Sequence, residues 1–338
     1  MGIHIGIIGY QNHASRLRDI IAKNSNVKLI TIYHPDKDKI DTLLKQKDNS
    51  QLIYTHIWSD LEEVDAYIIA SPSETHSNYL KKIIASYIGR SNLPYIYCEK
   101  PCATSLTELR WLKESSEELY PKLFFGFNYR FSKISCLIKE TLKEKTFGKP
   151  IYVNFNIAHG LAYKNSVAEN WRFTDSDIFS RISGNLGIHY IDLCISNFGK
   201  IHEIDIFEIN IAGHQKPDTS QIRLKFKDNF IANIFLSYAT VFSKEMTLFL
   251  SDAVLKVDEK DSRVFYPRDT YNLDGSFRQP VGKNYVSVTD CDRSSSGLQE
   301  AVSYFLKTVN NREHFKIEDF NLSLKSTHAV FSGFKIKK

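Results

Sequence analysis

A short turn near the start of the chain has the composition of a phosphate-binding loop. It consists of Gly9-Tyr10-Gln11-Asn12-His13-Ala14 and follows the β-branched run Ile3–Ile8. The dinucleotide fingerprint G-x-G-x-x-G/A joins a strand to a helix, whose free N–H groups bind a pyrophosphate. Gly9 and Ala14 match that pattern, whereas Gln11 replaces the glycine that normally lets the backbone approach the phosphate. Alone, this turn is weak evidence, because glycine turns before helices are common in α/β proteins.

A second position concerns the adenosine ribose of such a cofactor. An acid at the end of the second strand favours NAD, and its absence relieves repulsion of the 2′-phosphate of NADP. Here His34 closes the apolar run Val27–Tyr33, and the nearest acid is Asp36. His34 is either a ribose-binding residue or an exposed loop histidine, so the choice between NAD and NADP stays open.

Three further segments carry chemistry-bearing residues. They are Ala70-Ser71-Pro72-Ser73-Glu74-Thr75-His76, Glu99-Lys100-Pro101, and the stretch from Gly184 to Asp192, which contains Asn185 and His189. In this order and spacing they resemble the glucose–fructose oxidoreductase / inositol dehydrogenase (Gfo/Idh/MocA) family. The resemblance extends over nearly the whole chain, through Gly126–Phe131, Phe147–Ile151 and Trp171–Phe173.

The resemblance implies roles for a lysine and a histidine. It places Lys100 beside the nicotinamide and the reacting carbon, where an ammonium can stabilise a forming alkoxide and shuttle its proton. It makes His189 the base that takes or returns the hydroxyl proton. Without the resemblance, Lys100 would be an ordinary surface lysine before a turn proline, and His189 a satisfied helix histidine.

Asn185 departs from the family pattern, which usually has an aspartate four residues before the histidine. At this spacing the two side chains can share one face of an α-helix. A carboxylate would orient the ring and stabilise imidazolium, whereas an amide can only orient it. We therefore expect His189 to be a weaker base than is usual in the family, with Lys100 carrying more of the proton transfer.

Further site candidates follow from the same resemblance. The expected cofactor contacts are Gly9, Gln11, Asn12, His34, Ser71, Pro72, His76, Glu99 and Lys100. The expected substrate contacts are Asn128, Arg130, Tyr163, Trp171 and Arg172, which supply polar and stacking groups for a sugar. Arg130 or Arg172 could grip a phosphate or carboxylate, but each could equally form a structural salt bridge. His76 could instead cap its helix.

The order of predicted elements indicates a two-domain α/β protein. Residues 1–125 alternate short apolar strands with amphipathic helices, which predicts a Rossmann-type doubly wound parallel sheet. Residues 126–338 are rich in strands that alternate apolar and polar residues, and they include helices near Leu186–Asn197 and Gly297–Val309. This predicts an α+β domain with a large, mostly antiparallel open sheet. The polar segment 258–290 is expected to be a long loop or hairpin.

Composition narrows the functional classes. The chain has 338 residues, 44 Lys and Arg, and 39 Asp and Glu, and the small basic excess is dispersed rather than clustered as in nucleic-acid-binding proteins. No apolar run is long enough to span a membrane, and no signal peptide is evident. The five irregularly spaced cysteines complete no zinc site, so we expect no metal, reduced and mostly buried thiols, and a cytoplasmic protein.

The predicted function is hydride transfer between NAD or NADP and a secondary hydroxyl or ketone of a sugar, cyclitol or nucleotide-activated sugar. The family resemblance also makes a role in surface-polysaccharide sugar biosynthesis plausible. The alternative is a catalytically decayed member that binds a nucleotide or sugar as a regulatory protein, which Gln11, His34 and Asn185 would suit. Reduction of a non-sugar substrate is disfavoured by His189. An apolar outer face on the second sheet would favour a homodimer or homotetramer.

Overall fold

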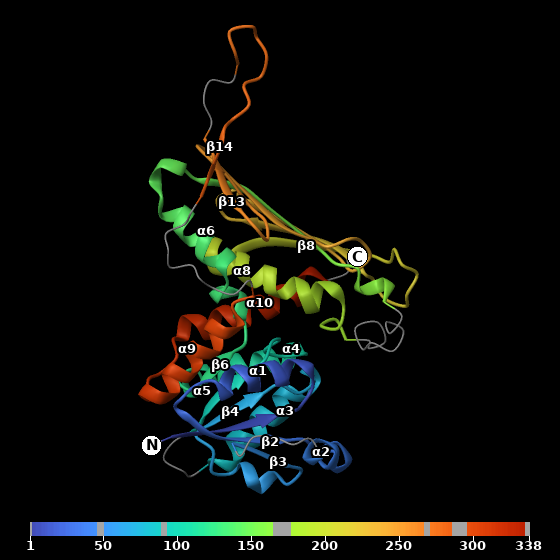
Figure 1. The fold of residues 1–338 in the computed structure, drawn as a ribbon, viewed down its shortest axis with the longest axis vertical. Coiled ribbons are helices and arrows are strands. Elements are labelled where there is room, and N and C mark those ends of the chain that lie inside the picture. The colour runs from blue at the N-terminus through green and yellow to red at the C-terminus, as the bar shows by residue number, and fades with distance from the viewer. Residues whose placement is uncertain are drawn as a thin grey trace. The chain divides into compact units, whose positions relative to one another are not determined.

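The computed structural model of the chain describes residues 2–45, 51–88, 93–164, 177–266, 271–285 and 296–334. The chain forms two compact units, coloured by residue number in Figure 1. The first unit contains residues 1–128 and 298–328, and the second contains residues 129–297 and 329–338. Residues 298–328, predicted as part of the second domain, thus belong to the first unit. The first unit is discontinuous in sequence, and no local pattern in the sequence indicates this.

The first unit is built on a six-stranded parallel sheet in the order β3-β2-β1-β4-β5-β6. The strands are β1 (Ile3–Ile8), β2 (Val27–Tyr33), β3 (Leu52–Thr55), β4 (Ala66–Ile69), β5 (Tyr95–Cys98) and β6 (Leu123–Phe125). Most of their side chains are buried, as expected for a parallel sheet covered on both faces. The order is that of the doubly wound dinucleotide-binding fold, with its switch point between β1 and β4. The predicted Rossmann-type sheet is confirmed.

Helices connect these strands and complete the unit. They are α1 (Asn12–Ala22), α2 (Lys37–Leu44), α3 (His76–Ser86), α4 (Leu106–Glu114), α5 (Ser116–Leu119), α9 (Leu298–Asn311) and the larger part of α10 (Ile317–Gly333). Phe305 of α9 contacts the ring of Tyr97 edge-on, at 5.6 Å between centroids. The Tyr95 hydroxyl donates to the Glu313 carbonyl at 2.9 Å. Aromatic packing and this hydrogen bond therefore attach the late helices to β5.

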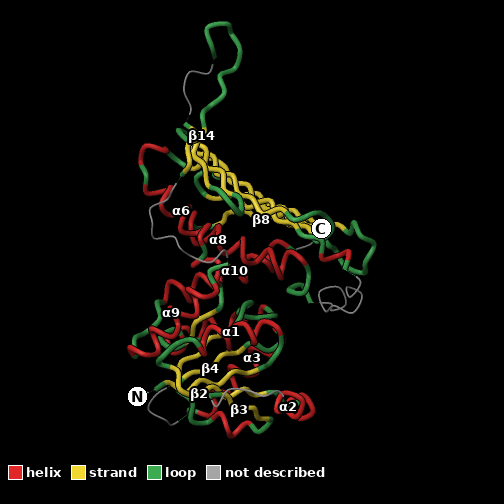
Figure 2. The backbone as a smooth tube through the Cα atoms, in the orientation of Figure 1, coloured by secondary structure: helices red, strands yellow, loops and turns green. Residues whose placement is uncertain are grey.

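The second unit contains an eight-stranded sheet in the order β14-β13-β12-β11-β7-β10-β9-β8. Its strands are β7 (Pro150–Ala158), β8 (Ile201–Ile209), β9 (Thr219–Phe226), β10 (Ile231–Ser237), β11 (Ser243–Leu250), β12 (Val254–Val257), β13 (Ser262–Phe265) and β14 (Gly282–Asn284). Neighbouring strands are antiparallel except for the parallel pair β7–β10. The predicted large, mostly antiparallel sheet is confirmed. Helices α6 (Lys133–Lys143) and α8 (Ile188–Phe198) lie along one of its faces (Figures 1 and 2).

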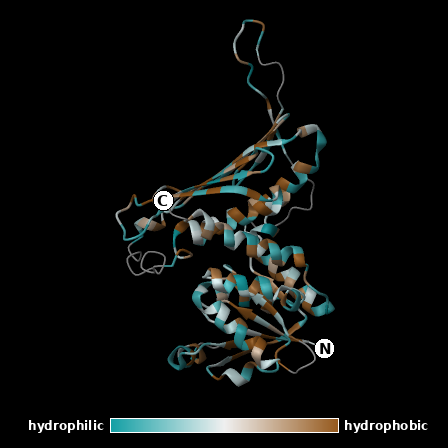
Figure 3. Ribbon diagram, turned by 180° about the vertical axis from the view of Figure 1, so that it is seen from behind, coloured by the Kyte–Doolittle hydropathy of each residue, from teal (hydrophilic) through white to brown (hydrophobic). Residues whose placement is uncertain are grey.

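The opposite face of this sheet is mixed rather than apolar. Phe207, Phe235 and Phe249 are exposed there, at 65%, 37% and 39%. Between them lies a ladder of polar groups in which the Asn233 side-chain amide donates to the Tyr152 hydroxyl at 2.9 Å. Figure 3 shows the same mixture of hydrophobic and hydrophilic residues along the strands. The expectation of an apolar outer face therefore needs correction, because amides and charged residues occupy many outward positions.

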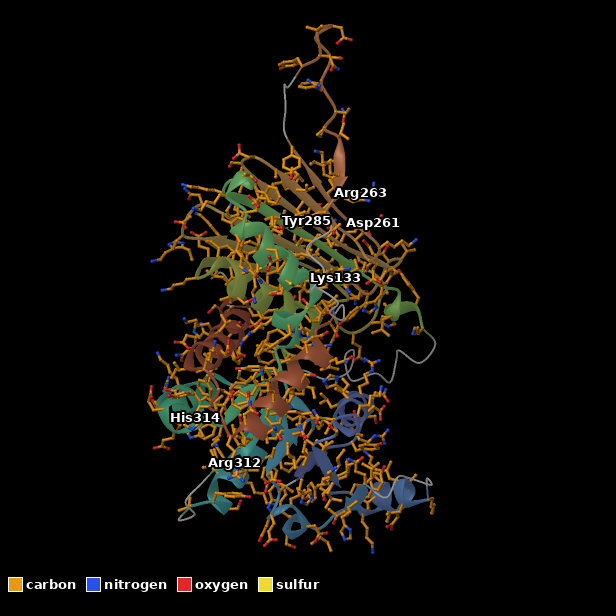
Figure 4. All side chains as sticks on the ribbon, turned by 60° about the vertical axis from the view of Figure 1, so that its left-hand side comes forward. Lys133, Asp261, Arg263, Tyr285, Arg312 and His314 are labelled. Carbon is orange, nitrogen blue, oxygen red and sulfur yellow. The ribbon has the colours of Figure 1, made fainter. Side chains whose placement is uncertain are left out.

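Strands β13 and β14 pair antiparallel within the segment 258–290, in agreement with the expected long loop or hairpin, and β13 begins beside the surface ion pair Asp261–Arg263 labelled in Figure 4. The helix α10 was not predicted from the sequence.

The cysteines agree only in part with the expected reduced thiols. Cys98, Cys102 and Cys194 are buried free thiols, as expected. Cys136, however, is disulfide-bonded, and such pairing cannot be deduced from spacing alone.

Candidate active site

The turn after β1 closely approaches the turn after β4. Gly9 has φ of +90°, and a Cβ there would lie 2.7 Å from Ser71 Cα and 2.9 Å from Ser71 N. Only glycine fits such a contact without strain, because L-residues rarely adopt positive φ. The Gly9 amide donates to the Tyr33 carbonyl at 2.9 Å, so this turn is also fixed to the end of β2. Gly9, Ser71 and His34 are therefore brought to one edge of the sheet, on either side of the switch point.

The first turn of α1 is suited to an anion. Gln11 is its N-cap residue, but its side chain makes no capping hydrogen bond and is exposed, as is Asn12. The amide groups that begin a helix lack partners within the helix and carry its partial positive charge. A glutamine at this position therefore leaves the N-terminus of α1 able to bind a pyrophosphate. The residues present fit the cofactor that the fingerprint implies.

Glu99, directly after β5, joins this edge through a residue that sequence reasoning missed. His13, on the first turn of α1, has its Nε2 2.7 Å from Glu99 Oε1. The Tyr97 hydroxyl also donates to Glu99, at 3.2 Å. The Glu99 carboxylate raises the pKa of His13, which favours a charged pair. The one signal for His13 in the sequence was its place inside the glycine turn, two residues after Gln11.

Lys100 lies next to this pair. Its backbone N–H donates to Glu99 Oε2 at 3.3 Å, and the peptide bond to Pro101 is cis. The Lys100 ammonium is one of the charges that act on the rings of both His13 and His76. The predicted cofactor contacts Glu99 and Lys100 thus share the carboxyl edge of the sheet with the Gly9 turn, which is where open α/β sheets bind ligands.

His76 ties the loops after β4 and β5 together. Its Nε2 lies 2.9 Å from the Ser71 carbonyl oxygen, and its Nδ1 lies 3.3 Å from the Pro101 carbonyl oxygen. The side chain is buried, and burial lowers its pKa. His76 stands at the first residue of α3, yet the N-cap residue of that helix is Thr75. The geometry describes a residue that positions the Ser71-Pro72 and Lys100-Pro101 turns rather than a helix cap.

In the second unit, His189 lies in the first turn of α8, half-buried. Its ring stacks on Tyr129 at 4.7 Å between centroids, with 26° between the planes. Tyr129 in turn meets Tyr190 edge-on at 5.3 Å, and burial raises the pKa of both phenols. Stacking on Tyr129, whose own ring packs against Tyr190, therefore limits the orientation of the imidazole.

Arg130 and Asp192 form a buried ion pair in the same unit. Arg130 Nε lies 2.8 Å from Asp192 Oδ2, and its Nη2 lies 2.6 Å from Asp192 Oδ1. Their side chains are 8% and 0% exposed. Such a bidentate pair uses the same atoms that would grip a substrate phosphate or carboxylate. The geometry thus favours the structural reading of Arg130: the pair ties the segment after β6 to α8.

The segment carrying Asn185 is not α-helical. Residues Ser183–Gly187 form a π-helical turn, and the α-helix begins at Ile188. The predicted helix start near Leu186 therefore lies within the π-turn. Single π-turns of this kind often occur at functional sites. Asn185 is buried, but the α-helical i, i+4 spacing used to place it beside His189 does not apply here.

The remaining predicted substrate contacts differ in their surroundings. Asn128 is buried, whereas Tyr163 is 62% exposed and donates to the Ala239 carbonyl at 3.2 Å. Trp171 and Arg172 lie outside the described residues. Among the described residues, no three His, Cys, Asp or Glu side chains gather as a metal site would require. In that same part of the chain, no helix is both long and apolar enough to cross a membrane.

Comparison with known proteins agrees with this architecture. Residues 3–127 match the model of the Gfo/Idh/MocA oxidoreductase family, NAD-binding Rossmann fold, and residues 137–256 match that of the Gfo/Idh/MocA C-terminal domain. A glucose-6-phosphate 3-dehydrogenase from Bacillus subtilis is 24% identical over 194 residues, which is 56% of this chain and 52% of that protein. A myo-inositol 2-dehydrogenase from Thermotoga maritima is 30% identical over 114 residues, 34% of this chain and 30% of that protein. The chain thus spans about half or less of the curated relatives it matches.

Solved structures share the fold over almost the full chain. A myo-inositol dehydrogenase from Corynebacterium glutamicum has a TM-score of 0.71 at 17% identity, covering 98% of this chain and 96% of that one. An oxidoreductase from Agrobacterium radiobacter, solved with NAD⁺, L-tartaric acid and magnesium, has a TM-score of 0.75 at 15% identity, covering 99% and 96%. At these identities the likeness establishes the fold. Taken with the two family models, it leads to one conclusion: the chain belongs to the Gfo/Idh/MocA family of NAD-binding oxidoreductases.

Proposed function

We propose that this protein is an NAD(P)-dependent oxidoreductase that transfers hydride to or from a secondary hydroxyl or ketone of a sugar, cyclitol or nucleotide-activated sugar. The observation that carries the proposal is the edge of the first sheet, where the Gly9 turn, the open N-terminus of α1, Glu99 and Lys100 come together. The named relatives, an inositol and a glucose-6-phosphate dehydrogenase, support the substrate class.

The bound nicotinamide would supply the hydride acceptor or donor. The chain's own residues would bind its pyrophosphate at the α1 N-terminus, where backbone N–H groups and the helix dipole favour an anion. Lys100 would stabilise negative charge on the substrate oxygen, because a lysine ammonium donates hydrogen bonds and holds positive charge. His189 would accept the hydroxyl proton during oxidation and return it during reduction.

Glu99 and His13 would keep Lys100 in place. A buried carboxylate needs a partner charge, and His13 supplies one from α1. The Glu99 carboxylate then remains available to the Lys100 backbone N–H rather than turning toward solvent. These contacts would hold α1 and the end of β5 in fixed positions relative to each other, at the edge where the cofactor would lie.

The decisive test combines binding and turnover. The full chain is incubated with oxidised or reduced cofactor and a panel of inositols, sugar phosphates and nucleotide sugars, and the cofactor absorbance is followed. Lys100→Met and His189→Asn should each lower kcat by about 10²–10⁴-fold, and His189→Asn should retain cofactor affinity. Lys113→Met and His202→Asn, at exposed positions, serve as matched controls. A chain that binds nucleotide but turns over no alcohol or ketone would instead support the regulatory alternative.

We also propose self-association through the outer face of the second sheet. The exposed rings of Phe207, Phe235 and Phe249 would supply the apolar contacts, and the neighbouring amides would add hydrogen bonds. Phe207→Glu together with Phe235→Glu should convert a dimer or tetramer to smaller species in light scattering. Val241→Glu with Phe242→Glu is the matched control, because those exposed residues lie in the turn between β10 and β11. A chain that is monomeric at all concentrations would refute this proposal.

A further inference from the structure

The end of β2 lies at the edge where a cofactor would bind, and it carries a histidine in place of an acid. His34 follows the last residue of β2, and its N–H donates to the Thr55 carbonyl at 3.1 Å. The preceding residue, Tyr33, accepts the hydrogen bond from Gly9. This hydrogen bonding sets His34 beside the phosphate-binding turn, at the position that meets the adenosine ribose in this fold.

The hydrogen bonding of the His34 ring fixes which group it presents. The backbone N–H of Asp36 donates to His34 Nδ1 at 3.1 Å, so Nδ1 is an acceptor and the proton of the neutral ring lies on Nε2. Partial burial, and after it the Lys39 ammonium, lowers the pKa of His34, so the ring is neutral at physiological pH. The free side of the ring therefore offers an N–H donor. A phosphate oxygen accepts such a bond, whereas the carboxylate that selects the ribose 2′-hydroxyl is absent.

The carboxylate of the nearest acid, Asp36, already accepts hydrogen bonds from a helix N-terminus. Asp36 is the N-cap residue of α2, and its Oδ1 accepts from the N–H groups of Asp38 and Lys39 at 3.0 and 3.4 Å. Its negative charge is therefore partly balanced by the helix N-terminus. The negative charge of Asp38, also in the first turn of α2, is partly balanced by the same helix N-terminus.

Two basic residues accompany this histidine. Lys37 and Lys39 are exposed on the first turn of α2. Lys39 is close enough to the His34 ring to act on it electrostatically. Long, flexible lysine side chains can place their ammonium groups near a phosphate and balance its charge. The end of β2 thus combines a hydrogen-bond donor with two mobile cations.

We propose that the protein prefers NADP(H) to NAD(H), with His34 donating a hydrogen bond to the 2′-phosphate and Lys37 and Lys39 supplying its counter-charge. The inference rests on the proposed function, because it requires a nicotinamide dinucleotide on the first unit. It sharpens that function by naming which of the two cofactors is used.

Direct titration of the full chain tests the preference. NADPH and NADH are titrated by calorimetry, together with 2′,5′-ADP and 5′-ADP, which carry the discriminating phosphate without the nicotinamide. NADPH should bind at least tenfold more tightly, which corresponds to about 1.4 kcal/mol. Rising salt should shrink the advantage, because exposed charges are screened.

Variants assign the preference to residues. His34→Asp restores a carboxylate and should reverse the preference toward NADH. Lys39→Ala should weaken NADPH binding several-fold and leave NADH binding unchanged. Lys45→Ala, at the C-terminal end of the same helix, is the matched control and should affect neither.

The possible outcomes separate this inference from the proposed function. Turnover with NADH bound as tightly as NADPH would overturn the inference and leave the function intact. Tighter NADPH binding without turnover of any alcohol or ketone would support the inference and refute the function. A chain that binds neither dinucleotide would refute both. A His34→Asp variant that keeps the wild-type preference would overturn the role of His34.

Discussion

Replacing Gly9 by alanine should destabilise the first unit well beyond the effect of backbone strain. The positive φ of Gly9 costs an L-residue about 1–3 kcal/mol. The new Cβ would also lie 2.7 Å from Ser71 Cα and 2.9 Å from Ser71 N, and these backbone atoms cannot rotate away. Such overpacking adds about 1–3 kcal/mol. The expected loss is therefore about 2–6 kcal/mol in the free energy of local opening around the Gly9 turn.

Gly199 provides the matched control. Its φ is +91°, but a Cβ there would meet no atom within 4 Å, so alanine costs the backbone strain alone. Because a two-unit chain has no single well-defined midpoint, local stability is best read by hydrogen exchange resolved to peptides. Gly9→Ala should lose more protection over β1 and α1 than Gly199→Ala loses over α8 and β8, by about 1–3 kcal/mol. Equal losses would refute the reasoning that β4 crowds this turn.

Three further predictions concern single pairs. Because Glu99 raises the pKa of His13, the pair should stabilise the first unit fully below about pH 6.5 and weaken as pH rises through the raised value. Hydrogen-exchange protection over α1, corrected for intrinsic exchange rates, should therefore fall more between about pH 6 and pH 9 in the wild type than in His13→Gln. Asp192→Leu should cost about 3–5 kcal/mol in the free energy of opening of α8, read by hydrogen exchange, because it leaves the buried Arg130 without this carboxylate. Adding Arg130→Met should recover most of that loss, and a double variant no more stable than the single one would exclude the ion pair as the cause. Asn185→Asp tests whether residue 185 reaches His189 despite the π-turn: a shift of the acid side of the kcat/KM profile to higher pH would show that it does, and an unchanged rate and profile would show that Asn185 has no such role.

Much of the first unit could be predicted because its signals are local. The run Ile3–Ile8 became β1 with the same bounds, and Val27–Tyr33 became β2, since buried parallel strands are continuous apolar runs. The Gly9 turn and the Glu99-Lys100-Pro101 segment directly follow β1 and β5, as the predicted strands before them indicated. His13 escaped notice because its importance depends on Glu99, 86 positions away in the chain.

The second unit was predicted less completely for equally physical reasons. The outer face of its sheet is mixed, because the amide ladder around Asn233 lies among exposed phenylalanines. Alternation of apolar and polar residues in the sequence does not show which of these residues share that face. The π-turn at Ser183–Gly187 changes the geometry around Asn185; it contains Gly184 and Gly187 but no proline, and glycine alone does not distinguish a π-turn from an α-helix start. Arg130 could grip either a ligand or Asp192 on sequence grounds, and only the three-dimensional contact favours the second.

The discontinuity of the first unit has a consequence for synthesis on the ribosome. Phe305 and Glu313 contact Tyr97 and Tyr95 of β5, yet they are translated roughly two hundred residues after them. Tyr95 and Tyr97 therefore stay without these partners while residues 129–297 of the second unit are made. During that interval the nascent chain offers an apolar surface that chaperones recognise, and a ribosome stalled before residue 298 would release a protein whose first unit is unfinished.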